Sequence, residues 1–137
     1  INGKVCKRVT IFLSVFNVHV NRVPIAGTIE EIRYNPGKFL AAFNPKASMD
    51  NEQNIILINN GKTHVFVKQI AGLIARRIVC WPKKGDYYES GQRYGLIRFG
   101  SRVDILLPEN TKLSVVCGDH VSGGSSIIGY LNTTKEN

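Results

Sequence analysis

The sequence of 137 residues is short of acidic residues, of paired cysteines and of long apolar runs. Ten Asp and Glu stand against 18 Lys and Arg, and the net charge of +8 favours an anionic partner: nucleic acid, a membrane surface or a phosphorylated ligand. Three cysteines cannot all pair and form no CxxC motif, which indicates free thiols in a reducing compartment. No stretch approaches the ~18 apolar residues that a membrane-spanning helix needs, and no signal peptide is visible.

Metal-binding patterns are lacking as well. No group of histidines, cysteines and carboxylates has the spacing of metal ligands, so the sequence predicts no metal site. What remains is an ordinary globular composition, with 43% hydrophobic residues and a length suited to one domain covering residues 1–137.

The hydrophobic residues recur mostly with period two, which predicts a mainly β fold. The run "NNGK" at 59–62 lies between two apolar segments and predicts a hairpin. Short helical turns are expected at 15–21 and at 47–53, where Ser48 is a suitable N-cap. The predicted strands are 7–16, 27–35, 54–60, 63–70 and 73–81, with two more inside 93–108. The segment 69–80 also fits a helix, but its β-branched residues favour a strand.

One internal repeat refines this prediction. The segments "KGDYYESGQRYGLI" (84–97) and "CGDHVSGGSSIIGYL" (117–131) both contain Gly-Asp, a spacer, a glycine and then an apolar strand. Two equivalent hairpins of this kind indicate a barrel-sandwich hybrid, the fold of biotinyl and lipoyl carrier domains. Those carriers modify a lysine in a Met-Lys-Met or Asp-Lys context, which this chain lacks. A carrier function is therefore disfavoured, and a non-catalytic binding module of this type stays open.

The stretch "RYGLIRFGSRVDILLP" (93–108) is interrupted by Gly100 and Ser101. Taken alone, the pair favours a β-bulge or a close backbone approach, and the chain holds a second such pair at Gly124-Ser125. The alternative is self-cleavage. A serine hydroxyl can attack the preceding carbonyl, which needs a base and oxyanion donors. β-Elimination of the resulting ester and hydrolysis would leave an N-terminal pyruvoyl group, an electron sink built from the chain itself.

Five ordered motifs decide between these interpretations. Together they resemble the phosphatidylserine decarboxylases, in the short bacterial and archaeal form, over nearly the whole chain. The resemblance implies cleavage at Gly100–Ser101 into two chains, with Ser101 becoming the pyruvoyl cofactor. This group would form a Schiff base with phosphatidylserine and release carbon dioxide to give phosphatidylethanolamine. The motifs are "FLSVFNVHVNRVPIAG" (12–27), "YNPGKFLAAFNPKA" (34–47), "NEQN" (51–54), "VKQIAGLIARRIV" (67–79) and "GLIRFGSRVDILLP" (95–108).

The resemblance also implies roles for single residues. His19 matches the first histidine of a family His-x-x-His motif, and Arg22 replaces the second. His19 is therefore the expected acid or base, in cleavage, in decarboxylation or in both. The aspartate that the family uses in cleavage lies in a Pro-x-Asp-Gly motif, which these 137 residues do not contain. We therefore expect a segment of the full protein to precede this chain, and the chain alone to fold without cleaving or decarboxylating.

The remaining expectations concern substrate and location. Asp104 could orient a partner near Ser101, but facing solvent or pairing with an arginine is favoured, and His64 and His120 should be structural or exposed. The expected partners are phosphatidylserine and an anionic membrane surface rather than nucleic acid, at the cytoplasmic face of the cell membrane. A homodimer stays open, as does a pyruvoyl decarboxylase acting on a soluble amino acid. The arginines expected to hold the substrate's phosphate or carboxylate are Arg22, Arg76, Arg77 and Arg102.

Overall fold

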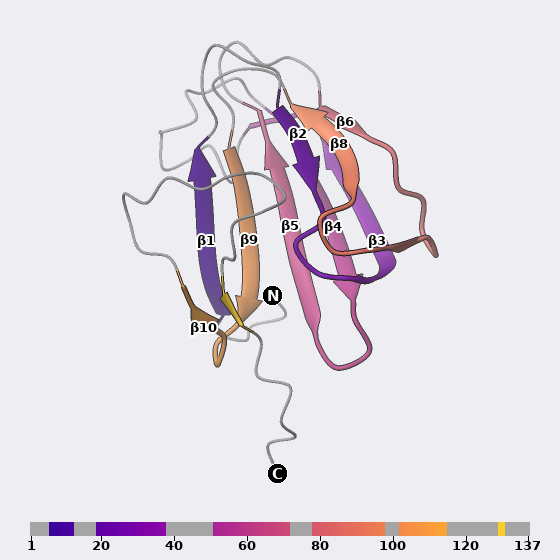
Figure 1. The fold of residues 1–137 in the computed structure, drawn as a ribbon. Coiled ribbons are helices and arrows are strands. Elements are labelled where there is room, and N and C mark those ends of the chain that lie inside the picture. Colours follow the sequence, from indigo (N-terminus) through magenta and orange to yellow (C-terminus); the bar gives the residue numbers. More distant parts are fainter. Residues whose placement is uncertain are drawn as a thin grey trace.

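The computed structural model describes residues 6–12, 19–37, 51–71, 78–97, 102–114 and 129–130, of which His19 and Tyr130 are described by their backbone alone. Every regular element among these residues is a β-strand, so the prediction of a mainly β fold is confirmed. The strands form antiparallel ladders in three sheets (Figure 1).

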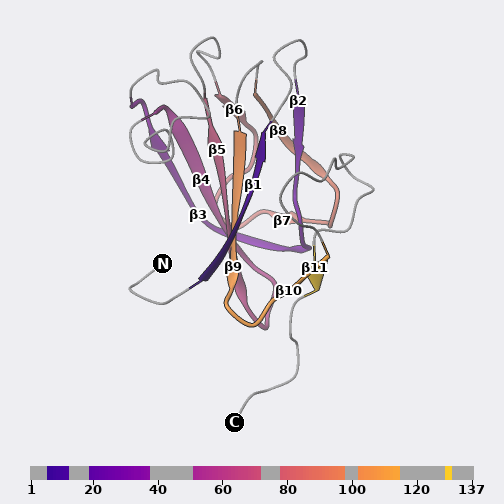
Figure 2. The same ribbon diagram turned by 90° about the vertical axis from the view of Figure 1, so that its left-hand side faces the viewer.

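The largest sheet has six strands. Their order is β1 (Cys6–Phe12), β9 (Arg102–Pro108), β5 (His64–Ile70), β4 (Gln53–Asn59), β3 (Gly27–Asn35) and β7 (Tyr87–Tyr88). A second sheet has three strands, in the order β2 (His19–Arg22), β8 (Arg93–Ile97) and β6 (Ile78–Cys80). A separate pair consists of β10 (Lys112–Leu113) and β11 (Gly129–Tyr130). Figure 2 shows β3, β4 and β5 of the six-stranded sheet diverging from β2 and β8 of the three-stranded sheet toward the top of the view.

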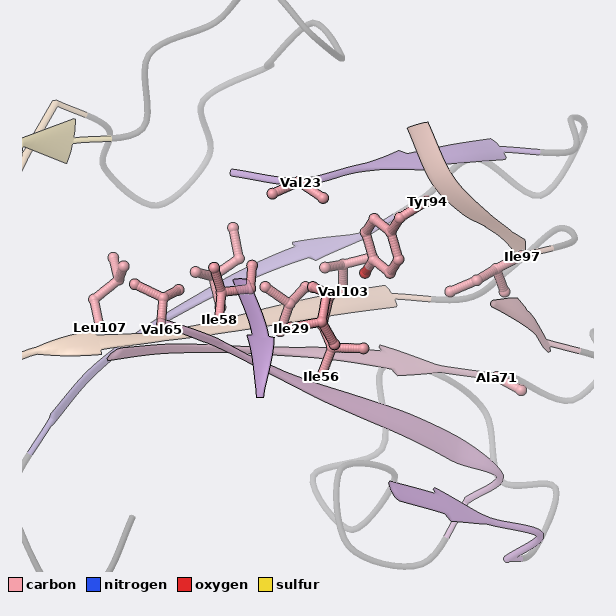
Figure 3. Packing of buried hydrophobic residues seen from close by; sticks show 12 residues of the cluster. Val23, Ile29, Ile56, Ile58, Val65, Ala71, Tyr94, Ile97, Val103 and Leu107 are labelled. Atoms are coloured by element: carbon pink, nitrogen blue, oxygen red, sulfur yellow. The ribbon is translucent and has the colours of Figure 1, made fainter. Parts of the chain in front are cut away.

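The core lies between the two larger sheets. Alternate residues of the six-stranded sheet point toward the three-stranded one, as in the row Ile56, Val67 and Ile105 from three neighbouring strands. Tyr94 and Ile97 of β8 close the layer from the other side (Figure 3). The other buried apolar side chains of this cluster are Val23, Ile29, Ile58, Val65, Ala71, Val103 and Leu107.

The predicted hairpin at 59–62 is confirmed and shows how the turn residues act. Gly61 has a φ of 95°, a backbone conformation that side-chain-bearing residues rarely adopt. The Gly61 N–H donates to Asn59 Oδ1 at 2.8 Å, and the Thr63 N–H donates to Asn60 Oδ1 at 2.9 Å. The two asparagines thus satisfy the backbone of the turn that joins β4 to β5.

Two expectations are corrected. Residues 19–21, expected in a helical turn, are strand β2, and residue 53, expected in another, begins β4. Pairing with neighbouring strands satisfies the backbone here, and no described residue is helical. Residues 51 and 52 of the second expected turn are not helical either, and residues 15–18 and 47–50 lie outside the described residues.

The first copy of the internal repeat is also not a simple hairpin. β7 pairs with β3 in the six-stranded sheet, whereas β8 pairs with β2 and β6 in the other. The second copy falls mostly outside the described residues, so the barrel-sandwich arrangement of equivalent hairpins stays a prediction.

The strands share a common end, which we call the upper end because it lies at the top of Figure 1. In the six-stranded sheet one row of paired residues closes this end: Phe12, Arg102, Ile70, Gln53 and Asn35. In the three-stranded sheet the corresponding row is His19, Ile97 and Ile78. The opposite end of the strands, which carries the turn after Asn59, is called the lower end.

Candidate active site

The interruption at Gly100-Ser101 coincides with a change of sheet. β8 ends at Ile97 in the three-stranded sheet, and β9 begins at Arg102 in the six-stranded sheet. Four residues, 98–101, therefore link the two sheets at the upper end, and they lie outside the described residues. The apolar alternation of 93–108 thus belongs to two strands in different sheets, which explains why it is interrupted at this place.

His19 is the first residue of β2 and pairs with Ile97, the last residue of β8. Ile97 also pairs with Ile78 on its other side, and Arg77 directly precedes Ile78 in the sequence. The topology therefore brings the backbone of His19 and the segments that hold Arg76, Arg77, Gly100 and Ser101 to one end of one sheet. These four residues themselves lie outside the described part of the chain.

Arg102 follows Ser101 directly and is buried in a polar cluster. Its Nη2 donates to Asp104 Oδ2 at 3.3 Å, and its Nε lies 3.3 Å from Asp104 Oδ1. Thr10 of β1 is paired with Asp104 in the ladder, and its hydroxyl donates to Asp104 Oδ1 at 2.8 Å. The expectation that Asp104 pairs with an arginine is confirmed, and the guanidinium of Arg102 points to a protein carboxylate.

Arg22 also has a protein partner, at some distance from His19. It ends β2 after an irregularity in the ladder, and its Nη1 donates to the Gly91 carbonyl oxygen at 2.9 Å. Gly91 has a φ of 80° in the turn between β7 and β8. Arg22 therefore fastens this turn to the three-stranded sheet.

Buried amides connect the two sheets just below the upper end. Gln69 Nε2 donates to Asn21 Oδ1 at 2.8 Å and to the Val79 carbonyl oxygen at 3.2 Å, and Asn54 Nδ2 donates to Gln69 Oε1 at 3.2 Å. Asn21, Asn54 and Gln69 are all buried, so their polar groups depend on one another. This chain of amides joins β4 and β5 of the larger sheet to β2 and β6 of the smaller one.

A glycine makes room for this network. A Cβ on Gly95 would overlap the Val79 carbonyl oxygen and would come within 2.7 Å of Gln69 Nε2. Gly95 lies in the middle of the three-stranded sheet, between Asn21 and Cys80. Its lack of a side chain lets the Gln69 amide approach the smaller sheet.

A buried carboxylate lies at the beginning of β4. The Tyr34 hydroxyl donates to Glu52 Oε2, and Glu52 is buried together with its neighbour Asn51. Asn51 Nδ2 donates to the Ala71 carbonyl oxygen at 2.6 Å, and the Ala71 N–H donates to the Glu52 carbonyl oxygen at 2.9 Å. The "NEQN" motif therefore fixes the beginning of β4 against the end of β5.

Two further titratable side chains are neutral parts of this layer. Burial raises the pKa of the Cys80 thiol to about 11, although a hydrogen bond with Asn54 opposes the shift. Burial also raises the pKa of the Tyr94 hydroxyl, and the nearby Cys80 adds to that shift. Neither side chain is charged near neutral pH, so neither supplies an ionised nucleophile.

Within the described ranges, no group of three His, Cys, Asp or Glu side chains could hold a metal ion. Across the same residues, no helix has the length and apolar character needed to cross a membrane.

Sequence reasoning missed the amide network and the role of Glu52. The available signal was a polar residue inside an apolar strand, as with Gln69 in "HVFVKQI" and Asn54 in "QNIILIN". A polar residue at such a place also fits a strand with a solvated face, so the pattern alone could not separate the two cases.

Comparison with known proteins completes the description of the site. The model of the family "Phosphatidylserine decarboxylase" matches residues 2–129. A phosphatidylserine decarboxylase proenzyme of Geotalea uraniireducens is 51% identical over 125 residues, which are 90% of this chain and 59% of the relative. The proenzyme of Desulfotalea psychrophila is 53% identical over 133 residues, 96% of this chain and 61% of the relative. The chain thus spans about three-fifths of the length of these relatives, and no solved structure matches it.

Proposed function

Because this chain belongs to the phosphatidylserine decarboxylase family, we propose that the complete protein cleaves itself at Gly100–Ser101 and then decarboxylates phosphatidylserine. The observation that carries the proposal is the agreement between the family match and the sheet change at 98–101. The matches give no support to an amino-acid decarboxylase or to a carrier-type binding module.

The strands around residue 101 suit a chain that is cut there. β9 begins one residue later and pairs with β1 along its whole length, from Phe12–Arg102 to Cys6–Pro108. On its other side β9 pairs with β5, from Ile70–Arg102 to Phe66–Leu106. A cut before a strand held on both sides leaves the second piece bound to the first, which a two-chain enzyme requires.

The pyruvoyl group made from Ser101 would supply the electron sink that lets carbon dioxide leave the substrate. The residues of this chain would position the reacting groups. We assign the transfer of protons to His19, since its backbone lies at the upper end and histidine titrates near neutral pH. We assign the anionic headgroup to Arg76 and Arg77, which directly precede β6 at this end. Arg22 and Arg102 are weaker candidates because protein groups already bind them.

The upper end is also the end that we propose to face the membrane. A lipid substrate keeps its acyl chains in the bilayer, so the reacting end has to approach the bilayer surface. Phe12, Val20 and Tyr34 are exposed apolar side chains near this end, from strands of both sheets, and Arg33 beside them is exposed as well. Apolar and basic side chains together are what an anionic bilayer attracts.

Intact-mass measurement on the complete gene product tests cleavage. We expect two chains, one ending at Gly100 and one beginning at residue 101 without a free α-amino group. Ser101→Ala is the control and should give one uncut chain. A folded wild-type protein that stays uncut, with Ser101 unchanged, would contradict the proposal.

His19→Ala separates the two steps of the proposed function. An uncut variant assigns His19 to cleavage, and a variant that is cut but does not release carbon dioxide assigns it to decarboxylation. A variant that is both cut and as active as the wild type would remove His19 from the mechanism. The measurements are intact mass and carbon dioxide release from phosphatidylserine in mixed micelles.

A further inference from the structure

Cleavage at Gly100–Ser101 would turn residue 101 into a chain end, and the polar cluster at the start of β9 lies next to this end. The reactive group would sit on the first residue of the new chain, one residue before β9 begins. Chain ends are poorly ordered unless other contacts hold them. A misplacement of about 1 Å at a reacting group can lower a rate about 100-fold. The new end therefore needs an anchor that works without the covalent bond to residue 100.

Arg102 and Asp104 have the properties of such an anchor. Their side chains are only 6% and 1% exposed, and two nitrogen–oxygen distances of 3.3 Å join them. They lie two residues apart and therefore on the same face of the sheet, where Thr10 on β1 donates to Asp104 and Lys68 on β5 is paired with it. Arg102, the second residue after the cut, is thus fastened both to its own strand and, through Asp104, to β1.

A buried ion pair is a poor way to gain stability, because removing two charges from water offsets most of their attraction. Apolar residues of similar volume would serve folding as well or better. What a charged pair with two contact points adds is a fixed direction for the arginine side chain and for the backbone that carries it. This argues for a role in geometry.

We propose that Arg102 and Asp104 are positioning residues that hold residue 101 in place after the chain has been cut. The inference rests on the proposed self-cleavage. It also differs from the expectation that Arg102 binds the substrate, because its guanidinium is buried against Asp104. Before cleavage the covalent chain restrains residue 101 from both sides, and afterwards the Arg102–Asp104 pair supplies the missing restraint.

The test uses the double variant Arg102→Met/Asp104→Leu in the complete gene product, which removes both charges and keeps similar volumes. We expect cleavage and thermal stability close to those of the wild type, and a kcat for phosphatidylserine about 100-fold lower with little change in KM. Hydrogen exchange gives a readout apart from activity. The amides of Val103 and Ile105 should exchange faster in the cut double variant than in its uncut Ser101→Ala form. In the wild type the two forms should be alike.

Two further variants keep the test decisive. Arg102→Lys retains the charge with a single contact point, so it should be cut normally and lose less activity than the double variant. Glu30→Gln/His64→Gln removes an exposed pair whose atoms are 2.9 Å apart, and it should change neither step.

The proposal is overturned if the double variant is cut and has wild-type kcat and exchange. It is also overturned if stability, cleavage and activity of the double variant fall together, since the pair would then act only in folding. A double variant that does not fold counts as the same outcome, unless Arg102→Lys is cut normally and loses decarboxylation activity. A wild-type protein that is never cut contradicts the proposed function itself, and this inference with it.

Discussion

The two ends of the strands handle polar groups in opposite ways. At the lower end the chain turns tightly after Asn59, and asparagine side chains at the surface satisfy the backbone. At and just below the upper end, polar side chains in the strands or next to them are buried, and they bind other side chains or backbone carbonyl oxygens. The members of this buried set are Asn21, Asn51, Glu52, Gln53, Asn54, Gln69, Arg102 and Asp104. At the lower end, Thr111 is the one buried polar residue among those that the structure describes.

The polar groups at the lower end serve folding, whereas those at the upper end serve the geometry of the candidate site. Turns close hairpins with local hydrogen bonds, and water can replace a lost bond at the surface. A buried polar network gives little net stability, but removing one member leaves its partners without hydrogen bonds. Such networks lie where the geometry has to be specified, and here they lie beside the sheet change at 98–101.

The largest expected effect compares two glycines. Gly95→Ala near the upper end should lower the free energy of unfolding by about 3 kcal/mol or more, because its Cβ would overlap the Val79 carbonyl oxygen. Gly61→Ala at the lower end meets no atom within 4 Å and should cost about 1–2 kcal/mol, through its φ of 95° alone. Urea denaturation of both variants measures the difference. Equal losses in the free energy of unfolding would show that the backbone of the smaller sheet shifts to make room for a Cβ at residue 95.

Two glutamines provide the next comparison. Gln69→Met keeps the shape of the side chain but removes the amide that Asn21, Asn54 and the Val79 carbonyl oxygen bind. The free energy of unfolding should fall by about 2–3 kcal/mol. Gln92→Met removes one bond from the exposed Glu89 N–H and should cost about 0.5 kcal/mol or less. Denaturation midpoints check both values. A Gln69→Met variant as stable as the wild type would mean that water replaces the lost amide.

The smallest expected effect concerns binding to lipid and uses residues matched in exposure. Phe12 and Val20 near the upper end are 58% and 39% exposed, and Tyr87 and Leu113, away from that end, are 59% and 39% exposed. Phe12→Gln/Val20→Gln should weaken binding to vesicles of phosphatidylcholine and phosphatidylglycerol about tenfold, because less apolar surface enters the bilayer.

Tyr87→Gln/Leu113→Gln is the control and should leave the vesicle binding unchanged. Co-sedimentation at low and at high salt measures the binding, and the basic charge should make it weaker at high salt. Equal losses in the two double variants would show that the upper end is not the face that meets the membrane.

The sequence by itself determined the long strands β3, β4 and β5, the hairpin at 59–62 and the family. Strands follow from the alternation of apolar residues, and the hairpin follows from turn chemistry within four residues; both are local. The expected strand at 27–35 has the bounds of β3, the one expected at 54–60 is shifted by one residue from β4, and the one expected at 63–70 begins one residue before β5. The family followed from five motifs in order, which need no knowledge of contacts.

Only the tertiary structure decided which strands are neighbours. β8 and β9 are four residues apart in the sequence and belong to different sheets, and β7 and β8 separate in the same way. Burial of Arg102, Asp104 and Gln69 depends on strands that are distant in the sequence, so the same letters would equally suit a solvated face. Pairing partners and burial arise from contacts between strands that are distant in the sequence, so the hydrophobic period of a single strand does not predict them.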